Sequence, residues 1–498
     1  MTTEQHRIET SATTGRSAET DSSCGWRCNV HGFYYMWYRS KERDGAWAHW
    51  NHRRLPHWDP QIAKKYSQDE HVPENDDIGS SYWPQLGPYS SLDPQVIATH
   101  MEMMKRAGIG VVVVSWYPPG LHDPALDGRN ETVELIGSLL LDAAWDHGMR
   151  IAIHLEPYEG RDPVSVRKDF EYIHRHYGSH PALHRVASTH GGALLPLVYI
   201  YDSYHNSPEE WARLLSPGGD ISVRGKDGFD CTAIFLWVEA THAAYAKSGF
   251  DGFYTYFAAT GFVYGSTPSN WPHMSRVARD EGIYFIPSVG PGYIDVEVRP
   301  WNYANTRDRR GGGYFDDMFT EAAKLQPEMV SITSFNEWHE GTNIEPAVDG
   351  KSTLASLKWP SRDYLSYGTD PEFYLTKTRQ WAERIFEPSH DPVTEAIGKS
   401  SDAQYYVNKK FADSVEAVTW ELDENKFSRD VLCTTVRQQM VGKLPTAITR
   451  GFARCGYVTS STCEEDLADF SRKAVGVEEE MTSASQGSII ESISAFLR

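Results

Sequence analysis

The chain has 498 residues, 40% of them hydrophobic, which is enough for one large domain with extensions. Its formal net charge of −20 and its lack of Lys and Arg clusters exclude nucleic-acid binding, because phosphate backbones are bound through clustered cations. No apolar run approaches the ~20 residues of a membrane span, so we expect neither a transmembrane segment nor a signal sequence in this chain.

Aromatic residues make up 12% of the chain, with 16 Trp and 27 Tyr. Such flat side chains with a polar tip are suited to stacking on the apolar faces of sugar rings. A neutral carbohydrate ligand therefore fits the composition better than an anionic one.

Residues 1–29 are rich in Ser, Thr and charge, and they predict a disordered segment. From residue 30, apolar runs alternate with helical patterns, as in βα units around a parallel sheet. The eight predicted strands are 32–38, 110–116, 150–156, 195–202, 232–239, 252–258, 284–290 and 329–335. The predicted helices are 94–107, 131–147, 164–177, 208–215, 242–248, 271–280, 315–325 and 371–386.

Eight strands with intervening helices predict an α/β fold, a (β/α)₈ TIM barrel with long βα loops over residues 30–388. The insertion at 39–92 is too rich in Trp, His and Tyr for disorder, and loops of that length are usually functional. Residues 389–498 form a C-terminal extension of unknown role.

The six cysteines are too few for a disulfide scaffold in so long a chain. Cys24 and Cys28 form a lone pair without the second half of a zinc site. We therefore expect no metal and no other cofactor.

The strongest local motif is Glu337 and Glu340, three residues apart just after a predicted buried strand. Glycosidic hydrolysis needs one protonated and one ionised carboxyl group, and this pair supplies both. The bland alternative is a solvated loop carboxylate or a partner for Arg299. The neighbouring Trp338 and His339 favour a site.

A second candidate follows another predicted strand, where alternation puts His154, Glu156 and Tyr158 on one side. A carboxylate inside a barrel needs partners, so this group indicates a site. Two alternatives stay open. In the first, Glu156 fills a layer of the barrel and is paired to His154. In the second, the two bind metal together with Asp202 or Glu239.

Longer strings resemble the endo-α-1,2-mannosidases of glycoside hydrolase family 99, in their animal-type form. The resemblance runs in register from about residue 32 to about residue 386. The matching strings include FYYMWY (33–38), HWNH (49–52), HWDP (57–60), DDIGSSYWPQLGPYSS (76–91), SWYPP (115–119), HLEPY (154–158), GFDGFYTYFA (249–258), FIPSVGPGYID (285–295), RPWN (299–302) and SFNEWHEGTNIEP (334–346).

The resemblance implies a metal-independent barrel enzyme that cleaves internally with retention of configuration. By resemblance, Glu337 is the base that deprotonates the mannose 2-hydroxyl, so that O2 attacks C1 and a 1,2-anhydro sugar forms. Glu340 is then the acid that protonates the leaving oxygen and later the base that activates water. The residues expected to bind substrate are His154, Glu156, Tyr117, Tyr256, Arg299, Asn336 and Trp338.

The implied substrate is a glucosylated high-mannose N-glycan, from which glucosyl-α-1,3-mannose is released. The resemblance also implies the Golgi lumen, where animal-type members are held by an N-terminal anchor. This chain shows no such anchor before Gly32, and we expect a monomer. Two alternatives remain, an inactive glycan-binding barrel and a different retaining glycosidase that uses Glu156 with Glu340.

Overall fold

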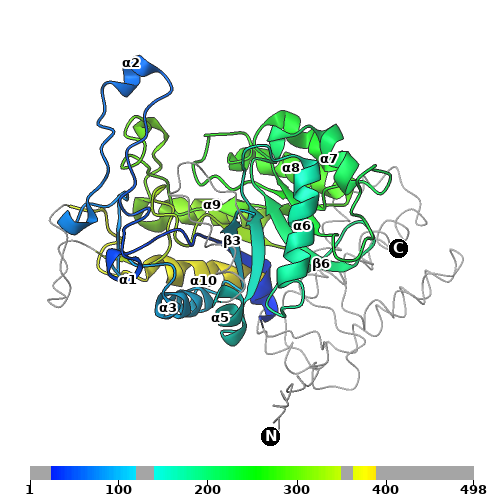
Figure 1. The fold of residues 1–498 in the computed structure, drawn as a ribbon, viewed down its shortest axis with the longest axis horizontal. Helices are drawn as coiled ribbons and strands as arrows, with labels where there is room; N and C mark the ends of the chain where they lie inside the picture. The colour runs from blue at the N-terminus through cyan, green and yellow to red at the C-terminus, as the bar shows by residue number, and fades with distance from the viewer. Residues whose placement is uncertain (1–23, 119–138, 349–362, 388–498) are drawn as a thin grey trace, which may run out of the picture. The chain divides into compact units, whose positions relative to one another are not determined.

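The computed structural model describes residues 24–118, 139–348 and 363–387, which form a β-barrel surrounded by helices (Figure 1). The segment expected to be disordered lies outside these ranges up to residue 23, and so do the C-terminal extension and the 131–138 part of one predicted helix. The described chain begins before the expected start at Val30. A 3₁₀ turn, η1 (Gly25–Asn29), lies there, and a disulfide joins Cys24 to Cys28.

One sheet contains nine parallel strands, which neighbour one another in the order β10-β11-β1-β3-β4-β6-β7-β8-β9. Their bounds are β1 (Val30–Tyr34), β3 (Val111–Trp116), β4 (Arg150–Leu155), β6 (Leu194–Ile200), β7 (Thr232–Leu236), β8 (Gly252–Tyr254), β9 (Tyr284–Ile286), β10 (Ser288–Val289) and β11 (Val330–Ile332). A further strand, β5 (Arg185–Ala187), pairs antiparallel with β6.

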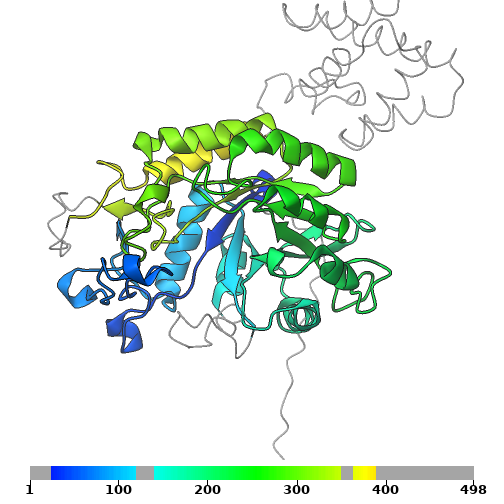
Figure 2. The same ribbon diagram turned by 90° about the horizontal axis from the view of Figure 1, so that it is seen from above.

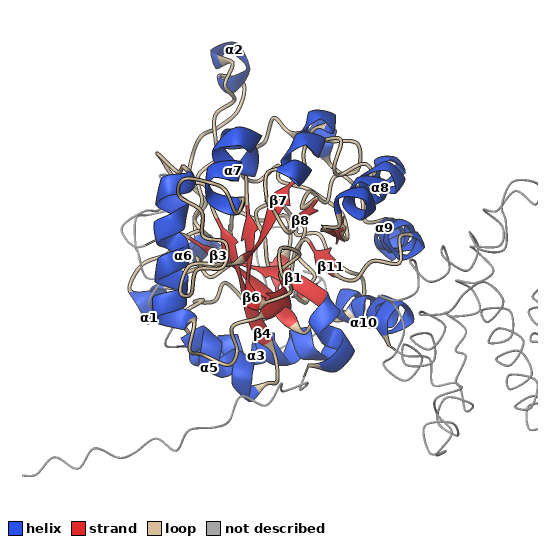
Figure 3. Ribbon diagram, turned by 90° about the vertical axis from the view of Figure 1, so that its right-hand side faces the viewer, coloured by secondary structure: helices blue, strands red, loops and turns tan. Residues whose placement is uncertain are grey.

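The ends of this order, β9 and β10, are two halves of one extended run interrupted at Pro287. Proline has no N–H to donate, but its carbonyl accepts a hydrogen bond from the Ser331 N–H at 3.1 Å. Since β9 pairs with β8 and β10 pairs with β11, the sheet closes on itself. The predicted (β/α)₈ barrel is confirmed, and Figure 3 shows its strands enclosed by helices.

The outer helices follow the predicted order closely (Figure 2). They are α3 (Pro94–Arg106), α5 (Leu141–Asp146), α6 (Pro163–Tyr177), α7 (Pro208–Leu215), α8 (Trp271–Glu281), α9 (Gly313–Lys324) and α10 (Phe373–Phe386). Capping boxes begin α6 at Asp162 and α7 at Ser207, each followed by a proline in the first turn. The predicted helix at 242–248 is instead a 3₁₀ segment, η5 (Ala240–Lys247).

The core has two layers separated by the strands. Val112 and Val114 of β3 pack outward among the helices, whereas Val111 and Val113 point into the barrel. The interior is filled by aromatic side chains such as Phe33, which is fully buried. Burial on both faces explains why these strands are continuous apolar runs.

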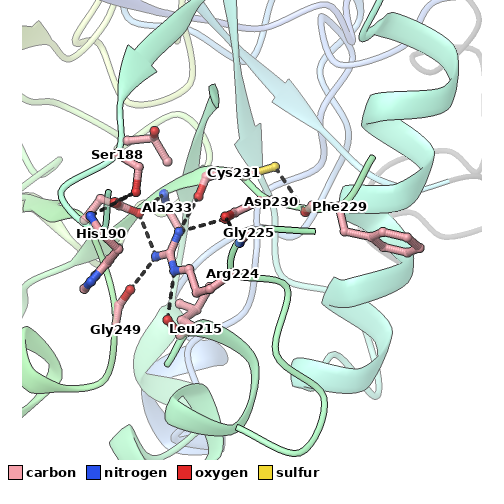
Figure 4. Close-up of polar contacts among 12 residues, drawn as sticks. Ser188, His190, Leu215, Arg224, Gly225, Phe229, Asp230, Cys231, Ala233 and Gly249 are labelled. Carbon is pink, nitrogen blue, oxygen red and sulfur yellow. Dashed lines mark hydrogen bonds and ion pairs between the residues drawn. The ribbon is translucent and has the colours of Figure 1, made fainter. Parts of the chain in front are cut away.

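The amino-terminal ends of β7 and β8 are tied together by one buried cation, Arg224 (Figure 4). Its guanidinium meets Asp230 at 2.9 Å and Asp251 at 2.7 Å, and it donates to three backbone carbonyls. Asp251 also accepts from Ser188 Oγ at 2.6 Å. This end of a barrel usually serves stability, and the fully paired charges fit that role.

The 39–92 insertion leaves the carboxyl end of β1 and is ordered, as its aromatic content predicts. It contains α1 (Lys41–Asp44), α2 (Pro60–Ala63), η2 (Pro73–Asn75) and β2 (Trp83–Pro84). β2 pairs antiparallel with β12 (Ala347–Val348), and α2 projects away from the barrel (Figure 1). In the described parts of the chain, no helix has the length and apolar character needed to cross a bilayer.

Candidate active site

The loop that follows β11 carries both candidate glutamates and is held by hydrogen bonds of its side chains and backbone. The Glu337 N–H donates to Ser334 Oγ at 2.8 Å, and Ser334 Oγ in turn bonds Thr342 Oγ1 at 2.8 Å. The carbonyl of Glu340 accepts from the Ile294 N–H at 2.8 Å. These contacts fix the backbone positions from which the side chains of Glu337 and Glu340 extend.

A buried arginine clamps the end of the same loop. Arg309 Nη2 donates to the carbonyls of Gly341 at 2.9 Å and Asn343 at 2.8 Å. Its guanidinium lies 4.4 to 4.7 Å from the ring centroids of Tyr82, Tyr367 and Tyr374. Cation–π contacts thus stabilise the charge that holds the loop.

Glu337 is only 5% exposed, and the side chain of Glu340 is 22% exposed. Burial raises the pKa of Glu337 well above its ordinary value, and the negative charge of Glu340 adds to this shift. Burial also raises the pKa of Glu340 to about 7, although Arg299 opposes the shift. Two coupled carboxyl groups that retain a proton near neutrality are suited to acid and base catalysis.

Arg299 is the cation beside this pair. Its Nη1 lies 3.9 Å from Glu340 Oε1 and 3.2 Å from Asp295 Oδ2. Asp295 is fully buried and also accepts from Tyr293 and Asn302, both at 2.9 Å. Asp295 therefore orients Arg299 toward Glu340, and no pattern in the sequence predicts this role.

The second predicted group, His154 and Glu156, belongs to the same site. His154 Nδ1 lies 3.2 Å from Glu156 Oε1, and its Nε2 lies 2.8 Å from Tyr254 Oη. The pairing expected of a layer-filling glutamate is therefore present. The charge of Glu156 also raises the pKa of both Glu337 and Glu340, so the three carboxyl groups share one electrostatic environment.

Tyr256 stands among these carboxyl groups and hydrogen-bonds Tyr35 through their hydroxyls. Burial raises the pKa of Tyr35 well above its ordinary value, with the charges of Glu156 and Glu337 adding to the shift. Tyr35 is a site residue that strand-end reasoning missed, although it lies within the FYYMWY string.

Asn336 and Trp338 are fully buried, and their polar atoms bond to neighbouring parts of the protein. The Tyr35 N–H donates to Asn336 Oδ1 at 2.8 Å, and Asn336 Nδ2 donates to the Tyr35 carbonyl at 2.9 Å. Trp338 Nε1 donates to Glu345 Oε2 at 3.1 Å. The polar side-chain atoms of both residues are therefore used in holding the loop.

Tyr117 follows β3 and is 8% exposed. Trp116 is in register with Leu155, and the Glu156 N–H donates to the Trp116 carbonyl at 3.0 Å. This register brings Tyr117 beside Glu156. Tyr117 and Pro118 are the last described residues before 119–138.

Metal binding was one alternative for His154 and Glu156. Within residues 24–118, 139–348 and 363–387, no three His, Cys, Asp or Glu side chains are grouped so as to hold an ion.

A hollow of about 410 Å³ lies elsewhere, within the 39–92 insertion, between Trp47, Trp83 and Glu74. None of the candidate catalytic residues lines it.

A (β/α)₈ barrel with two buried, neighbouring glutamates at the carboxyl end of its strands is the arrangement of a glycoside hydrolase. Comparison with known proteins supports this class and narrows it. Residues 27–387 match the family model described as glycosyl hydrolase family 99, and the chain belongs to this family.

Three similar proteins illustrate the relationship. A rat glycoprotein endo-alpha-1,2-mannosidase is 47% identical over 376 residues, covering 75% of this chain and 78% of the relative. A human glycoprotein endo-alpha-1,2-mannosidase-like protein is 46% identical over 361 residues, covering 72% and 76%. The solved GH99 endo-alpha-mannosidase from Bacteroides thetaiotaomicron superposes with a TM-score of 0.63 at 41% identity, covering 72% of this chain and 97% of that one.

Proposed function

We propose that this glycoside hydrolase is a retaining endo-α-1,2-mannosidase that acts on glucosylated high-mannose N-glycans and releases glucosyl-α-1,3-mannose. The family and the names of the similar mammalian proteins support the linkage. We further propose the Golgi lumen as its location and a monomer as its active form.

The proposed mechanism rests on the surroundings of the Glu337 carboxyl group. Its Oε2 is enclosed, and no hydrogen bond to it is found among the described residues. A buried carboxylate oxygen without a partner is costly, so it is ready to accept from a substrate hydroxyl. We assign that donor as the 2-hydroxyl of the mannose whose bond is cleaved.

In the first step Glu337 takes the O2 proton while O2 attacks C1. The bond from C1 to the leaving oxygen breaks, and Glu340 gives its proton to that oxygen. In the second step Glu340 takes a proton from water and the water oxygen attacks C1. The C1–O2 bond of the anhydro sugar breaks, and Glu337 returns its proton to O2. Two inversions at C1 give net retention. The partial exposure of Glu340 suits the group that must meet water.

The electrostatics set a condition on the first step. In the free site the more deeply buried Glu337 competes for the proton that Glu340 must donate. A hydrogen bond from the substrate to Glu337 favours the ionised form of this carboxyl group and thereby moves the proton toward Glu340. Substrate binding thus prepares both groups for their roles.

The remaining expected site residues have supporting parts in this proposal. Arg299 stabilises negative charge at Glu340, and Glu156, held by His154, accepts from sugar hydroxyls. Tyr256 and Tyr117 contact the sugar. Asn336 and Trp338 maintain the loop that carries the two glutamates.

The test compares Glu337→Gln with Glu340→Gln on a glucosyl-mannosyl-mannoside and on the corresponding glycosyl fluoride. Fluoride leaves without help from an acid, so Glu340→Gln should still release fluoride in the first step, although its second step, in which Glu340 is the base, should be slow. The natural substrate, which needs the acid, should not be cleaved even in the first step. Glu337→Gln should lose both activities, by about 10³-fold or more, as expected for a group acting in the bond-breaking step.

Each alternative has its own outcome. If Glu337→Gln keeps parental activity and Glu156→Gln loses it, Glu156 is the nucleophile and the anhydro-sugar route is wrong. If the parent binds the glycan without cleaving it, the chain is a binding barrel. Release of single mannose would mean exo action.

A further inference from the structure

An exposed aromatic cluster stands where the arm formed by residues 53–72 meets the segment around Trp301. Trp58 is 79% exposed, the largest exposure among the large hydrophobic side chains described. Its ring centroid lies 3.8 Å from His57 and 5.1 Å from Trp301, and the two indole planes cross at 82°. We call these three rings the rim platform. A mostly exposed tryptophan grouped with two further rings presents a flat apolar surface of the kind that meets a ligand or partner.

The base of the arm is fixed to the segment around Trp301. The Leu55 N–H donates to the Val298 carbonyl at 2.7 Å, and Trp301 Nε1 donates to the Leu55 carbonyl at 3.1 Å. His71 Nε2 also bonds the Glu297 carbonyl at 2.9 Å. The rings therefore stand on a fixed base, and beyond them the arm continues into α2, which projects from the barrel (Figure 1).

The same segment connects the rim platform to the catalytic loop. Arg299 lies 3.9 Å from Glu340, and Trp301 is two residues further on, which is a span of at most about 7 Å along the backbone. The arm follows the carboxyl end of β1, and Trp301 follows that of β10. Both ring-bearing segments thus rise from the face of the barrel that holds the glutamates.

The chemistry of the rim platform favours a neutral sugar. Two indole faces at nearly a right angle offer flat apolar surfaces. The charged residues beside them on the arm are of both signs, with Asp59 before α2 and Lys64 and Lys65 after it, so neither sign dominates. A chain with a net charge of −20 is repelled by anionic lipid surfaces and by nucleic acids. Sugar C–H faces stack on such rings and need no counter-charge.

We propose that Trp58, with His57 and Trp301, forms an outer subsite that stacks on a sugar residue of the same glycan, beyond the bond that is cleaved. This inference rests on the proposed function, which supplies a branched glycan long enough to reach the rim. The subsite selects for extended glycans over short oligosaccharides.

The test is Trp58→Ala, measured on a full glucosylated high-mannose glycan and on a glucosyl-mannosyl-mannoside. Loss of one stacked ring should raise KM for the full glycan by about three- to tenfold with kcat unchanged, and leave the short substrate unaffected. Trp58→Phe should recover most of the loss. Leu194→Ala is the matched control, because Leu194 is 58% exposed at the start of β6, on the opposite end of the barrel.

Two outcomes would overturn the proposal. An unchanged KM for the full glycan would mean that the ring does not meet the substrate. An equal loss on both substrates would mean a structural effect on the catalytic loop. If the parent cleaves neither substrate, the proposed function fails separately, and calorimetric binding of the uncut glycan to parent and Trp58→Ala still decides whether the subsite exists.

Discussion

Replacing Arg299 by methionine should move the pH dependence of catalysis in a direction that the structure fixes. Arg299 lies 3.9 Å from Glu340. Burial raises the pKa of Glu340, Arg299 lowers it, and the pKa that results from both is about 7. An opposite charge at such a distance is worth about one to three pKa units. We expect a shift of about one unit, because the Arg299 side chain is 34% exposed and also forms an ion pair with Asp295.

The sign follows from the role of Glu340 as the acid. The acid works only while protonated, so activity is present below the pKa of Glu340 and lost as pH rises through it. Without Arg299 that pKa rises, and the alkaline limb of kcat/KM should move upward by about one pH unit. The height of the profile will also fall if Arg299 binds substrate, but the position of the limb is independent of its height.

The assay is kcat/KM on a glucosyl-mannosyl-mannoside from pH 4 to 10, with circular dichroism to confirm folding. Asp295→Asn is the opposed control, because the charge of Asp295 raises the pKa of Glu340, and its removal should lower the limb. An alkaline limb that stays in place or moves downward in Arg299→Met would refute the assignment of Glu340 as the acid.

Two further predictions concern the framework. Arg224→Met leaves Asp251 buried without its cation and should cost about 3–5 kcal/mol of unfolding free energy, seen in chemical denaturation, while kcat of the folded enzyme is unchanged; a loss below 1 kcal/mol would contradict the structural role. Gly341→Ala adds a Cβ that would stand 2.6 Å from Ile294 Cγ2, at φ +58°, and the displaced loop should lower kcat by about 10- to 100-fold; kcat within twofold of the parent would contradict this.

The barrel was predictable because strands buried on both faces produce long apolar runs, and 111–116 is such a run. The predictions that were wrong concern short segments. The helix expected at 242–248 folded as 3₁₀, a segment whose apolar residues have no helical face. The disulfide between Cys24 and Cys28 was missed because neither spacing nor composition reports how the two side chains face each other.

The site was partly predictable for a similar reason. Glu337, Glu340 and Glu156 follow strand ends, where a parallel barrel gathers its chemistry. The hydroxyl contact of Tyr35 with Tyr256 joins residues 221 positions apart, and no local pattern records it. Trp58 lies in a loop whose path depends on hydrogen bonds to the 297–301 segment, which only the fold reveals.

The paired hydrogen bonds between Asn336 and the Tyr35 backbone join the loop after the last strand to the loop after the first. During synthesis the first strand emerges about 300 residues before its partner, and domains fold as their elements become available. The catalytic loop gains its support only when β11 closes the ring beside β1. A growing chain that holds every other strand of the barrel therefore still lacks this support, and the catalytic loop is one of the last parts of the barrel to be fixed.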